Sequence, residues 1–245
     1  MLKLVDVHKS FGGQKVLSGV NLHIPRGKIT VIIGASGVGK SVLLKHMIGL
    51  LQPDKGKVFV DGIDLGALTP TALVALRKKF GMLFQGAALF DSLNVFENVA
   101  FPLLEHTNLS SDEIKERVLK TLALVGLHGM ERKMPSELSG GMKKRAGLAR
   151  AIILEPEVIL YDEPTTGLDP IMTDSVDNLI LNMQQKLKIT SVVISHDIKS
   201  AFNIADQIAM LHNGKVIEAG TPREFRSTRN QVVMGFIGVE DTVEL

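Results

Sequence analysis

The segment from residue 34 to residue 41 restricts the possible folds of this chain more than any other. It reads Gly-Ala-Ser-Gly-Val-Gly-Lys-Ser, and it lies between a run of β-branched residues, 29–33, and a segment of helical character, 40–50. A strand that enters a glycine-rich turn and continues as a helix is the arrangement in which backbone N–H groups surround phosphate groups. A continuous apolar strand also indicates burial on both faces, as in parallel sheets. The segment therefore predicts a phosphate-binding loop in an α/β fold.

Each residue type in this loop has a chemical reason to be there. Glycines let successive N–H groups turn inward, where a Cβ atom would obstruct a phosphate. Lys40 is expected to reach the β- and γ-phosphates, and the Ser41 hydroxyl to ligate Mg²⁺. The alternative is a glycine-rich turn that binds nothing. The predicted nucleotide contacts are Gly34, Ala35, Ser36, Gly37, Val38, Gly39, Lys40 and Ser41.

A second apolar strand, 158–161, ends in two carboxylates, Asp162 and Glu163. Side chains alternate along a strand, so we expect these two to face opposite sides and to have different roles. Asp162 is expected to hold Mg²⁺, while Glu163 faces the terminal phosphate and activates the attacking water. The alternative is a strand that finishes in solvated acidic residues.

The remaining patterns divide the chain into three stretches. Strand patterns alternate with helical ones before residue 86 and after residue 156, which is typical of a parallel, doubly wound core. Between these limits the strand signal nearly vanishes, and Ser110 with Glu113 forms a capping box before an apolar stripe of helical period. We expect a single domain with a core lobe of residues 1–85 and 157–225, a helical subdomain of residues 86–156 and a C-terminal tail of residues 226–245.

The predicted strands at the two ends of the chain belong to two separate antiparallel groups. Alternating segments with turn signals before the phosphate loop predict a small antiparallel β subdomain. Near the other end, Asn213-Gly214 is a two-residue turn that favours a β-hairpin. The expected strands are 2–7, 16–24, 29–33, 57–60, 63–65, 81–84, 158–161, 189–194, 207–211 and 215–219, with a long helix over 171–188.

Composition excludes several other classes of protein. The chain contains no Cys, which excludes a disulfide scaffold, a thiolate nucleophile and cysteine-ligated metal sites. Its 28 basic and 26 acidic residues leave a net charge of +2, so there is no overall electrostatic footprint for nucleic acid. No uninterrupted apolar run approaches the roughly 20 residues that cross a bilayer. We therefore expect a soluble, globular, cytoplasmic protein without nucleic acid as a partner.

Further motifs reveal a family resemblance. Leu138-Ser139-Gly140-Gly141-Met142 resembles the signature motif of ATP-binding-cassette (ABC) ATPases, although many relatives carry Gln where Met142 stands. Four more segments match that family in order and spacing, so the resemblance spans nearly the whole chain. These are Gln85 after a strand, Asp162-Glu163-Pro164, Gly167-Leu168-Asp169-Pro170 and Ser195-His196-Asp197. The resemblance implies a P-loop NTPase fold with ATP and Mg²⁺ as cofactors.

The resemblance also implies roles for residues outside the phosphate loop. Two copies of such a domain pack head to tail as a homodimer and enclose two ATP molecules, with Ser139, Gly140 and Gly141 facing the γ-phosphate held by the other copy. Gln85 is then expected to sense Mg²⁺ and water, and Asp169 to lie at the dimer seam. His196 is expected to contact the γ-phosphate and Phe11 to stack on adenine. The alternatives are a structural histidine and an ordinary packed phenylalanine.

Three segments resemble one subfamily more closely, namely residues 83–99, 101–107 and 134–137. They are similar to the ATPase subunits of Mla-type (Mce-associated) phospholipid transport systems. This implies integral-membrane permease subunits, a small regulatory STAS-type subunit, a periplasmic Mce-domain protein, and a peripheral position on the cytoplasmic face of the inner membrane. The alternatives are the ATPase of an amino acid or organic anion importer, a soluble cassette of DNA repair or translation, and a subunit that does not hydrolyse ATP.

Two groups of residues have less specific patterns. The basic triplets Arg77-Lys78-Lys79 and Lys143-Lys144-Arg145 are interpreted as solvated helix faces, with contact to a partner or to anionic headgroups as the alternative. Leu89, Phe90, Leu93 and Phe96 are expected in the core of the helical subdomain, with some of them lining a groove that receives a helix of the permease.

Overall fold

Two β-sheets of different kind form the centre of the molecule, as seen in a computed structural model that describes residues 1–241. The smaller sheet is antiparallel, with strand order β2-β1-β4-β5. This confirms the predicted antiparallel subdomain, to which two strands after the phosphate loop also belong, with a turn that pairs Val60 with Ile63. Its strands are β1 (Leu2–Phe11), β2 (Gln14–Ile24), β4 (Lys55–Val60) and β5 (Ile63–Asp64).

The larger sheet has the strand order β10-β9-β3-β8-β7-β6. All neighbouring pairs are parallel except β9 and β10, which form the hairpin predicted from Asn213-Gly214. That turn also meets the smaller sheet, since the N–H of Ser18 donates to the carbonyl of Gly214 at 2.8 Å. The strands are β3 (Ile29–Ile33), β6 (Phe80–Leu83), β7 (Val158–Asp162), β8 (Thr190–Ile194), β9 (Gln207–His212) and β10 (Lys215–Gly220).

Helices surround the sheets, and most of them begin at a side-chain cap. The capping box of Ser110 and Glu113 is confirmed at the start of α4, and Asn94 with Glu97 forms another at α3. The helices are α1 (Lys40–Met47), α2 (Pro70–Arg77), α3 (Val95–His106), α4 (Ser111–Leu124), α5 (Gly140–Ile152), α6 (Pro170–Leu187), α7 (Ile198–Ile204), α8 (Pro222–Arg226) and α9 (Gln231–Asp241), with 3-10 turns at Leu65–Ala67 and Pro135–Glu137.

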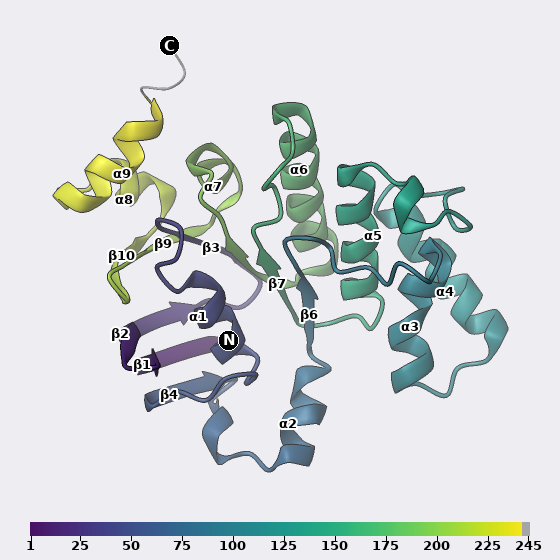
Figure 1. The fold of residues 1–245 in the computed structure, drawn as a ribbon, viewed down its shortest axis with the longest axis horizontal. Coiled ribbons are helices and arrows are strands. Elements are labelled where there is room, and N and C mark those ends of the chain that lie inside the picture. The colour runs from purple at the N-terminus through teal and green to yellow at the C-terminus, as the bar shows by residue number, and fades with distance from the viewer. Residues whose placement is uncertain (242–245) are drawn as a thin grey trace.

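The helical region predicted for residues 86–156 contains α3, α4 and α5, which lie together beyond the β6 edge of the larger sheet (Figure 1). The sequence patterns did not predict α2, α7, α8 or α9. The expected tail of residues 226–245 includes α9, and its last four residues lie outside the described part of the chain.

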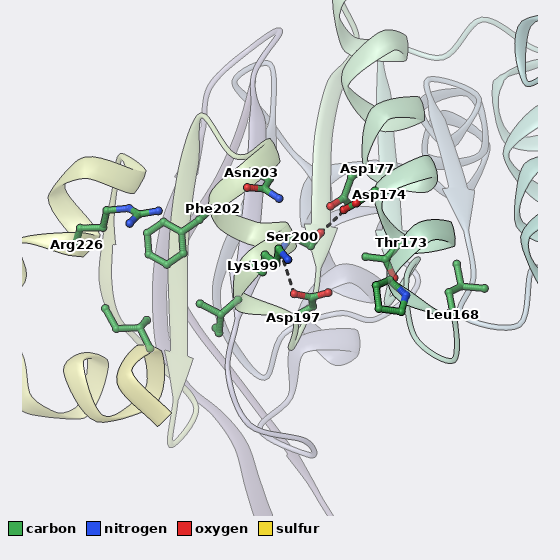
Figure 2. A pocket seen from close by; sticks show the side chains of 13 residues that line it. Leu168, Thr173, Asp174, Asp177, Asp197, Lys199, Ser200, Phe202, Asn203 and Arg226 are labelled. Carbon is green, nitrogen blue, oxygen red and sulfur yellow. Dashed lines mark hydrogen bonds between the residues drawn. The ribbon is translucent and has the colours of Figure 1, made fainter. Parts of the chain in front are cut away.

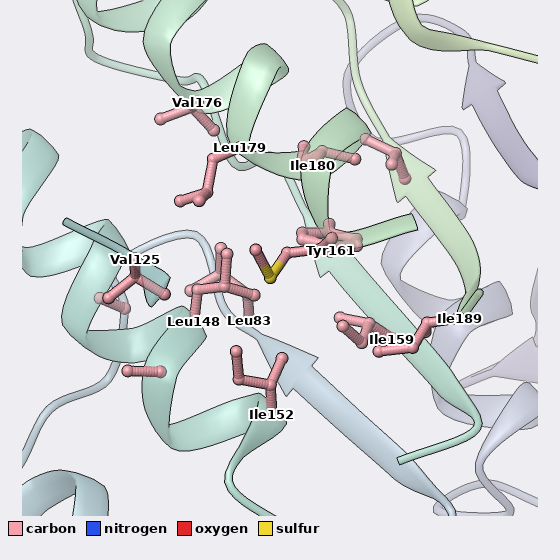
Figure 3. Packing of buried hydrophobic residues seen from close by; sticks show 14 of the residues in the cluster. Leu83, Val125, Leu148, Ile152, Ile159, Tyr161, Val176, Leu179, Ile180 and Ile189 are labelled. Atoms are coloured by element: carbon pink, nitrogen blue, oxygen red, sulfur yellow. The ribbon is translucent and has the colours of Figure 1, made fainter. Parts of the chain in front are cut away.

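The core that fixes the site lies where α5 and α6 pack on the strands β6 and β7. Figure 3 shows Leu148 from α5 and Leu179 from α6 directed toward Tyr161 of β7 and Leu83 of β6. Tyr161 is completely buried. Burial of apolar surface contributes about 25 cal/mol per Å², so this cluster holds the carboxyl ends of β6 and β7 in fixed positions relative to α5. Within residues 1–241 we find no helix with the length and apolar character that a bilayer crossing requires.

Candidate functional site

The phosphate loop connects β3 to α1 in the way the sequence predicts. At two of its positions only glycine fits, because the backbone has a positive φ and because another segment of the chain lies where a Cβ atom would be. Gly34 has φ +150°, and a Cβ there would lie 2.3 Å from the carbonyl oxygen of Leu211. Gly39, with φ +103°, precedes Lys40 at the start of α1, and a Cβ there would lie 2.8 Å from Cγ1 of Val16. The loop is therefore shaped by contacts with β2 and β9.

Lys40 lies inside this loop, with 6% of its surface exposed. Its ammonium donates to the carbonyl oxygens of Gly34 at 2.8 Å and Ala35 at 3.1 Å, and it lies 3.6 Å from Oε1 of Glu163. A buried ammonium held mainly by carbonyl oxygens is well placed to exchange those partners for the oxygens of an anion, because charge-assisted bonds are stronger.

Ser41 and Asp162, which the sequence predicts as Mg²⁺ ligands, contact each other. The Ser41 hydroxyl donates to Oδ1 of Asp162 at 3.0 Å, so the start of α1 and the end of β7 meet at this point. Burial raises the pKa of the Asp162 carboxyl, and the hydrogen bond from Ser41 opposes that shift. Hydroxyl and carboxylate oxygens are hard ligands of the kind that Mg²⁺ selects together with phosphate oxygens and water. The donor set therefore fits Mg²⁺.

Glu163 differs from the prediction in its geometry. Strand β7 ends at Asp162, and Glu163 has a left-handed φ of +50°, so strand alternation does not apply to it. The expectation that the two carboxylates face opposite sides is therefore wrong, because the backbone turn brings both to the edge where β3 enters the phosphate loop. Oε2 of Glu163 lies 2.6 Å from Nδ1 of His196 and accepts from the Thr166 hydroxyl at 3.0 Å.

The sequence did not single out Thr166. Its position three residues after Glu163, in a turn that Pro164 begins, is a local signal for such a contact. Together, these bonds aim one carboxylate between the ammonium of Lys40 and the imidazole of His196. The side chain of His196 is 56% exposed, so the imidazole faces open space beside the loop.

Three other predicted nucleotide contacts, Phe11, Gln85 and Asp169, are at exposed positions. Phe11, at the end of β1, is 46% exposed, and the ammonium of Lys9 lies 5.5 Å from its ring centre. Gln85 follows β6 and is also exposed. Exposed Asp169 caps α6, accepting from the N–H of Met172 at 2.9 Å. Because 46% of its surface is exposed, Phe11 is not an ordinary packed phenylalanine.

The signature residues lie at the start of α5, beside α6. Ser139 caps the helix by accepting from the N–H of Met142 at 3.3 Å. A Cβ on Gly140 would lie 3.6 Å from Cδ2 of Leu168, in the loop before α6. In Figure 1, strands β6 and β7 lie between α5 and α1. Ser139 and Gly140 are exposed at this helix start.

The interpretation of the basic triplets as solvated faces is wrong for three of their six residues. Lys144 is buried, with 6% of its surface exposed. Arg145 donates to the carbonyl of Val125 and to the hydroxyl of Ser175, each at 2.6 Å. Arg77 donates to the carbonyl oxygens of Ile48 at 3.1 Å and Gly49 at 2.6 Å, at the end of α1. Arg77 and Arg145 are partly buried, and these cations are tolerated because protein oxygens replace water.

An apolar groove of about 560 Å³ lies between α2, β6 and α3. Phe90 lines it and packs against Phe101, with ring centres 4.9 Å apart. Of the four apolar residues expected near a permease helix, Phe90 is the one that lines this groove. Leu89 and Phe96 instead pack against the main core.

A separate cavity of about 830 Å³ lies between α6, α7 and α8 (Figure 2). Its most buried charged group is Asp177 of α6, which is 4% exposed and accepts from the Ser200 hydroxyl at 2.7 Å. The second oxygen of that carboxyl, Oδ2, has no hydrogen-bond partner within the described residues. Burial raises the pKa of Asp177 to about 6.

Comparison with known proteins gives consistent matches. The model of the family described as "ABC transporter" matches residues 17–166. The chain is 44% identical over 226 residues to the intermembrane phospholipid transport system ATP-binding protein MlaF of Haemophilus influenzae, covering 92% of this chain and 86% of that protein. It is 41% identical over 242 residues to MlaF of Escherichia coli K12, covering 98% and 90%.

Another relative is named for a different cargo. The probable ribonucleotide transport ATP-binding protein mkl of Mycobacterium tuberculosis is 45% identical over 226 residues, or 92% of this chain. The chain spans 63% of the length of that relative. Among solved structures, the ATP-binding cassette MJ0796, a dimer bound to ADP and Pi, has a TM-score of 0.83 at 33% identity, covering 91% of this chain and 99% of that one. For cbiO1 from Clostridium perfringens the TM-score is 0.85 at 31% identity, with 98% of each chain covered.

Proposed function

This chain belongs to the ABC transporter family, and we propose that it is the ATP-hydrolysing subunit of a membrane transporter whose cargo is phospholipid. The observation that carries the ATPase proposal is the position of Glu163. Its carboxylate lies 3.6 Å from the ammonium of Lys40 and 2.6 Å from the imidazole of His196, at the mouth of a phosphate loop. A non-hydrolysing subunit has no use for that arrangement.

The residues of the site have separate tasks in this proposal. Backbone N–H groups of residues 34–41 and the ammonium of Lys40 bind the phosphates, with the start of α1 adding its partial positive charge. Glu163 accepts a proton from the attacking water, and His196 orients that carboxylate from the other side and reaches the terminal phosphate. Mg²⁺, when bound to Ser41 and Asp162, supplies charge neutralisation on the phosphate oxygens. Phe11 stacks on the base, and Gln85 responds to the occupied site.

The site is completed by a second copy of the chain. Ser139 and Gly140 are exposed at the start of α5, so this helix start is open to an anion held by another subunit. Asp169 is exposed in the adjoining loop. A head-to-tail homodimer under twofold symmetry would place each of these helix starts against the partner's nucleotide. The dimeric state of MJ0796 supports this part of the proposal.

The choice of cargo rests on the relatives. The two MlaF proteins, which are described as parts of an intermembrane phospholipid transport system, are covered over 86% and 90% of their lengths. The mycobacterial relative described as a probable ribonucleotide transporter makes ribonucleotides the second candidate cargo, but the chain spans 63% of that protein. The greater coverage of the MlaF proteins supports phospholipid.

The partners in this proposal are permease subunits of the Mla/Mce type, with the apolar groove around Phe90 and Phe101 as the seat of a permease helix. A small regulatory STAS-type subunit and a periplasmic Mce-domain protein, reached through the permease, complete the assembly. The chain then lies peripherally on the cytoplasmic face of the inner membrane.

The experiment that tests function and cargo together isolates the Glu163→Gln protein from native membranes with ATP and Mg²⁺. Attached proteins and co-purified lipids are identified by mass spectrometry, and the same preparation with ADP is the control. A polytopic permease with enriched glycerophospholipid in the ATP sample is the expected result. A permease without lipid enrichment contradicts the phospholipid cargo. DNA-repair proteins or ribosomes without a permease contradict transport itself.

A further inference from the structure

The described chain contains a buried cation that the nucleotide site does not use. Lys144 lies on α5, five residues after Ser139, and it is 6% exposed. Ammonium groups are rarely buried to this extent without partners that replace water. Burial lowers the pKa of Lys144, whereas the nearby charges of Asp162 and Glu163 act in the opposite direction.

The partners of Lys144 belong to two different motifs. Its ammonium donates to the carbonyl oxygen of Gln85 and, at 3.4 Å, to the carbonyl oxygen of Glu163. Gln85 comes two residues after the end of β6, and Glu163 directly follows β7. These strands are neighbours in the parallel sheet. One side chain of the signature helix therefore joins the backbones of the two segments that are proposed to respond to Mg²⁺ and to activate water.

The helix is held close enough to keep this contact in place. A Cβ on Gly147, three residues after Lys144, would lie 2.9 Å from Cδ1 of Leu83 and 3.1 Å from Cβ of Ala87. Arg150 donates to the carbonyl of Ala87 at 3.0 Å. Helix α5 thus contacts Leu83 before Gln85 and Ala87 after it. The residues of α5 therefore have little freedom to shift relative to this segment.

Glu163 gives the contact a catalytic consequence. Its left-handed backbone, φ +50°, is uncommon for a residue with a side chain, and it is this turn that directs the carboxylate toward Lys40 and His196. A hydrogen bond to its carbonyl oxygen restrains the orientation of the next peptide unit and so the direction of the side chain.

On the basis of the proposed ATPase function, we propose that Lys144 is a positioning residue for hydrolysis, which joins the signature helix to the backbones of Gln85 and Glu163 and so holds the water-activating carboxylate in its working direction. Lys144 does not touch the nucleotide. The loss of its ammonium is therefore expected to reduce turnover while the affinity for ATP is preserved.

The test compares four forms of the full chain in its transporter complex: wild type, Lys144→Met, Lys144→Arg and Lys143→Met. Met preserves the length and apolar stem of Lys144 without its charge, Arg keeps a charged N–H donor, and Lys143 is the neighbouring, partly exposed lysine of the same helix. The kcat of Lys144→Met is expected to fall about 10- to 100-fold, because small misplacements of a reacting group have effects of that size. Its KM for ATP stays within about threefold, Lys144→Arg recovers most of the loss, and Lys143→Met behaves as wild type.

A second readout does not depend on turnover. Hydrogen–deuterium exchange of the nucleotide-free chain is expected to become faster in Lys144→Met at residues 84–88 and 163–167 and to stay unchanged in Lys143→Met. If Lys144→Met does not fold, Lys144→Leu, which also has an apolar side chain, takes its place in both measurements.

The outcomes separate this proposal from the one it rests on. A wild-type kcat for Lys144→Met, or unchanged exchange in the two segments, overturns the positioning role while the ATPase function stands. A rise in KM that matches the fall in kcat/KM also overturns it, because that result places Lys144 in ATP binding. A wild-type complex that does not hydrolyse ATP overturns the proposed function, and the positioning role with it.

Discussion

The molecule contains two lysines buried to the same extent, Lys40 and Lys144, each 6% exposed, and they differ in what surrounds them. Lys40 lies in a glycine-rich loop and combines two carbonyl partners with a carboxylate at 3.6 Å. Lys144 lies in a helix, and its hydrogen-bond partners are the carbonyl oxygens of Gln85 and Glu163. The phosphate-loop motif predicts a ligand-binding role for Lys40, whereas no motif singles out Lys144, whose partners are other parts of the chain.

Both lysines lie close to Glu163. The ammonium of Lys40 lies beside its side-chain carboxylate, and the ammonium of Lys144 donates to its backbone carbonyl. Substitutions that affect one of these contacts and spare the other will separate the chemical role of the residue from its structural role.

The largest effect is expected for Glu163→Gln, which removes the carboxylate beside Lys40 and keeps the carbonyl that Lys144 contacts. General-base catalysis contributes about 10²- to 10⁴-fold, so ATP hydrolysis should fall by at least about 100-fold. Phosphate release measured under saturating ATP tests this, with ATP binding by calorimetry as the control that the fold and the loop are intact. Near-normal hydrolysis would remove Glu163 from the catalytic role.

The next effect is expected for Lys40→Ala, which affects the loop and leaves the Lys144 contacts in place. Hydrogen bonds to charged groups contribute about 1.5–3 kcal/mol, and Lys40 is placed to make more than one, so ATP affinity should fall by about 100-fold or more. Isothermal titration calorimetry measures the loss. Lys28→Ala is the matched control, because Lys28 pairs with Asp206 at the surface, at 3.0 Å. Retained affinity in Lys40→Ala would contradict phosphate binding by the loop.

Asp177 extends the comparison to a buried charge of the opposite sign. Burial raises its pKa to about 6, so the folded protein binds this proton as the pH falls below about 6, and the unfolded chain binds it only near 3.8. The folded state therefore holds more protons between these values, and this carboxyl makes the protein less stable as the pH rises through about 6. Asp177→Asn removes the buried charge and should raise the free energy of unfolding at pH 7.5 by about 1–2 kcal/mol.

Urea denaturation at pH 5 and pH 7.5 measures this change for Asp177→Asn. The gain should be smaller at pH 5, where the wild-type carboxyl is already protonated. Asp91→Asn, which removes an exposed carboxylate that does not line the cavity of Asp177, is the control. A stability loss of equal size at both pH values would show that Asp177 acts through its hydrogen bond to Ser200 and not through its charge.

The smallest effect is expected for Phe11→Ala, at a surface residue of the same site. Stacking of a base on an aromatic ring contributes about 1–3 kcal/mol, and the exposed ring of Phe11 is expected to lie at the low end, giving about a fivefold weaker affinity for ATP. Inorganic tripolyphosphate has no base and should bind wild type and Phe11→Ala equally. Equal losses for both ligands would instead indicate a general change in the loop.

The comparison of the two lysines also explains what the sequence could predict. The phosphate loop, the strand ending at Asp162 and the hairpin at Asn213-Gly214 depend on local geometry, and the structure contains all three. The burial of Lys144 depends on which face of a helix meets the sheet. Helical spacing did contain the signal, because Lys144 shares a stripe with Gly141, Leu148 and Ile152, all buried.

Two other features were not accessible from local patterns. The left-handed turn at Glu163 depends on its N–H bonding the carbonyl of Ile194, a residue of a different strand. The raised pKa of Asp177 depends on how α6 and α7 pack together. Both arise from contacts between segments that only the folded chain brings together, whereas propensity and spacing report on neighbours in sequence.

The strand order β9-β3-β8 has a consequence for the synthesis of the protein. Strand β3, which leads into the phosphate loop, pairs with β8 through Ile29 and Ser191 and with β9 through Thr30 and Gln207. At a translation rate of about 5–20 residues per second, both neighbours leave the ribosome on the order of ten seconds after β3. During that interval β3 is an apolar strand with two unpaired edges, the kind of segment that associates with other chains. The nascent protein therefore depends on chaperones or on its own early subdomain to cover the strand that later carries the nucleotide.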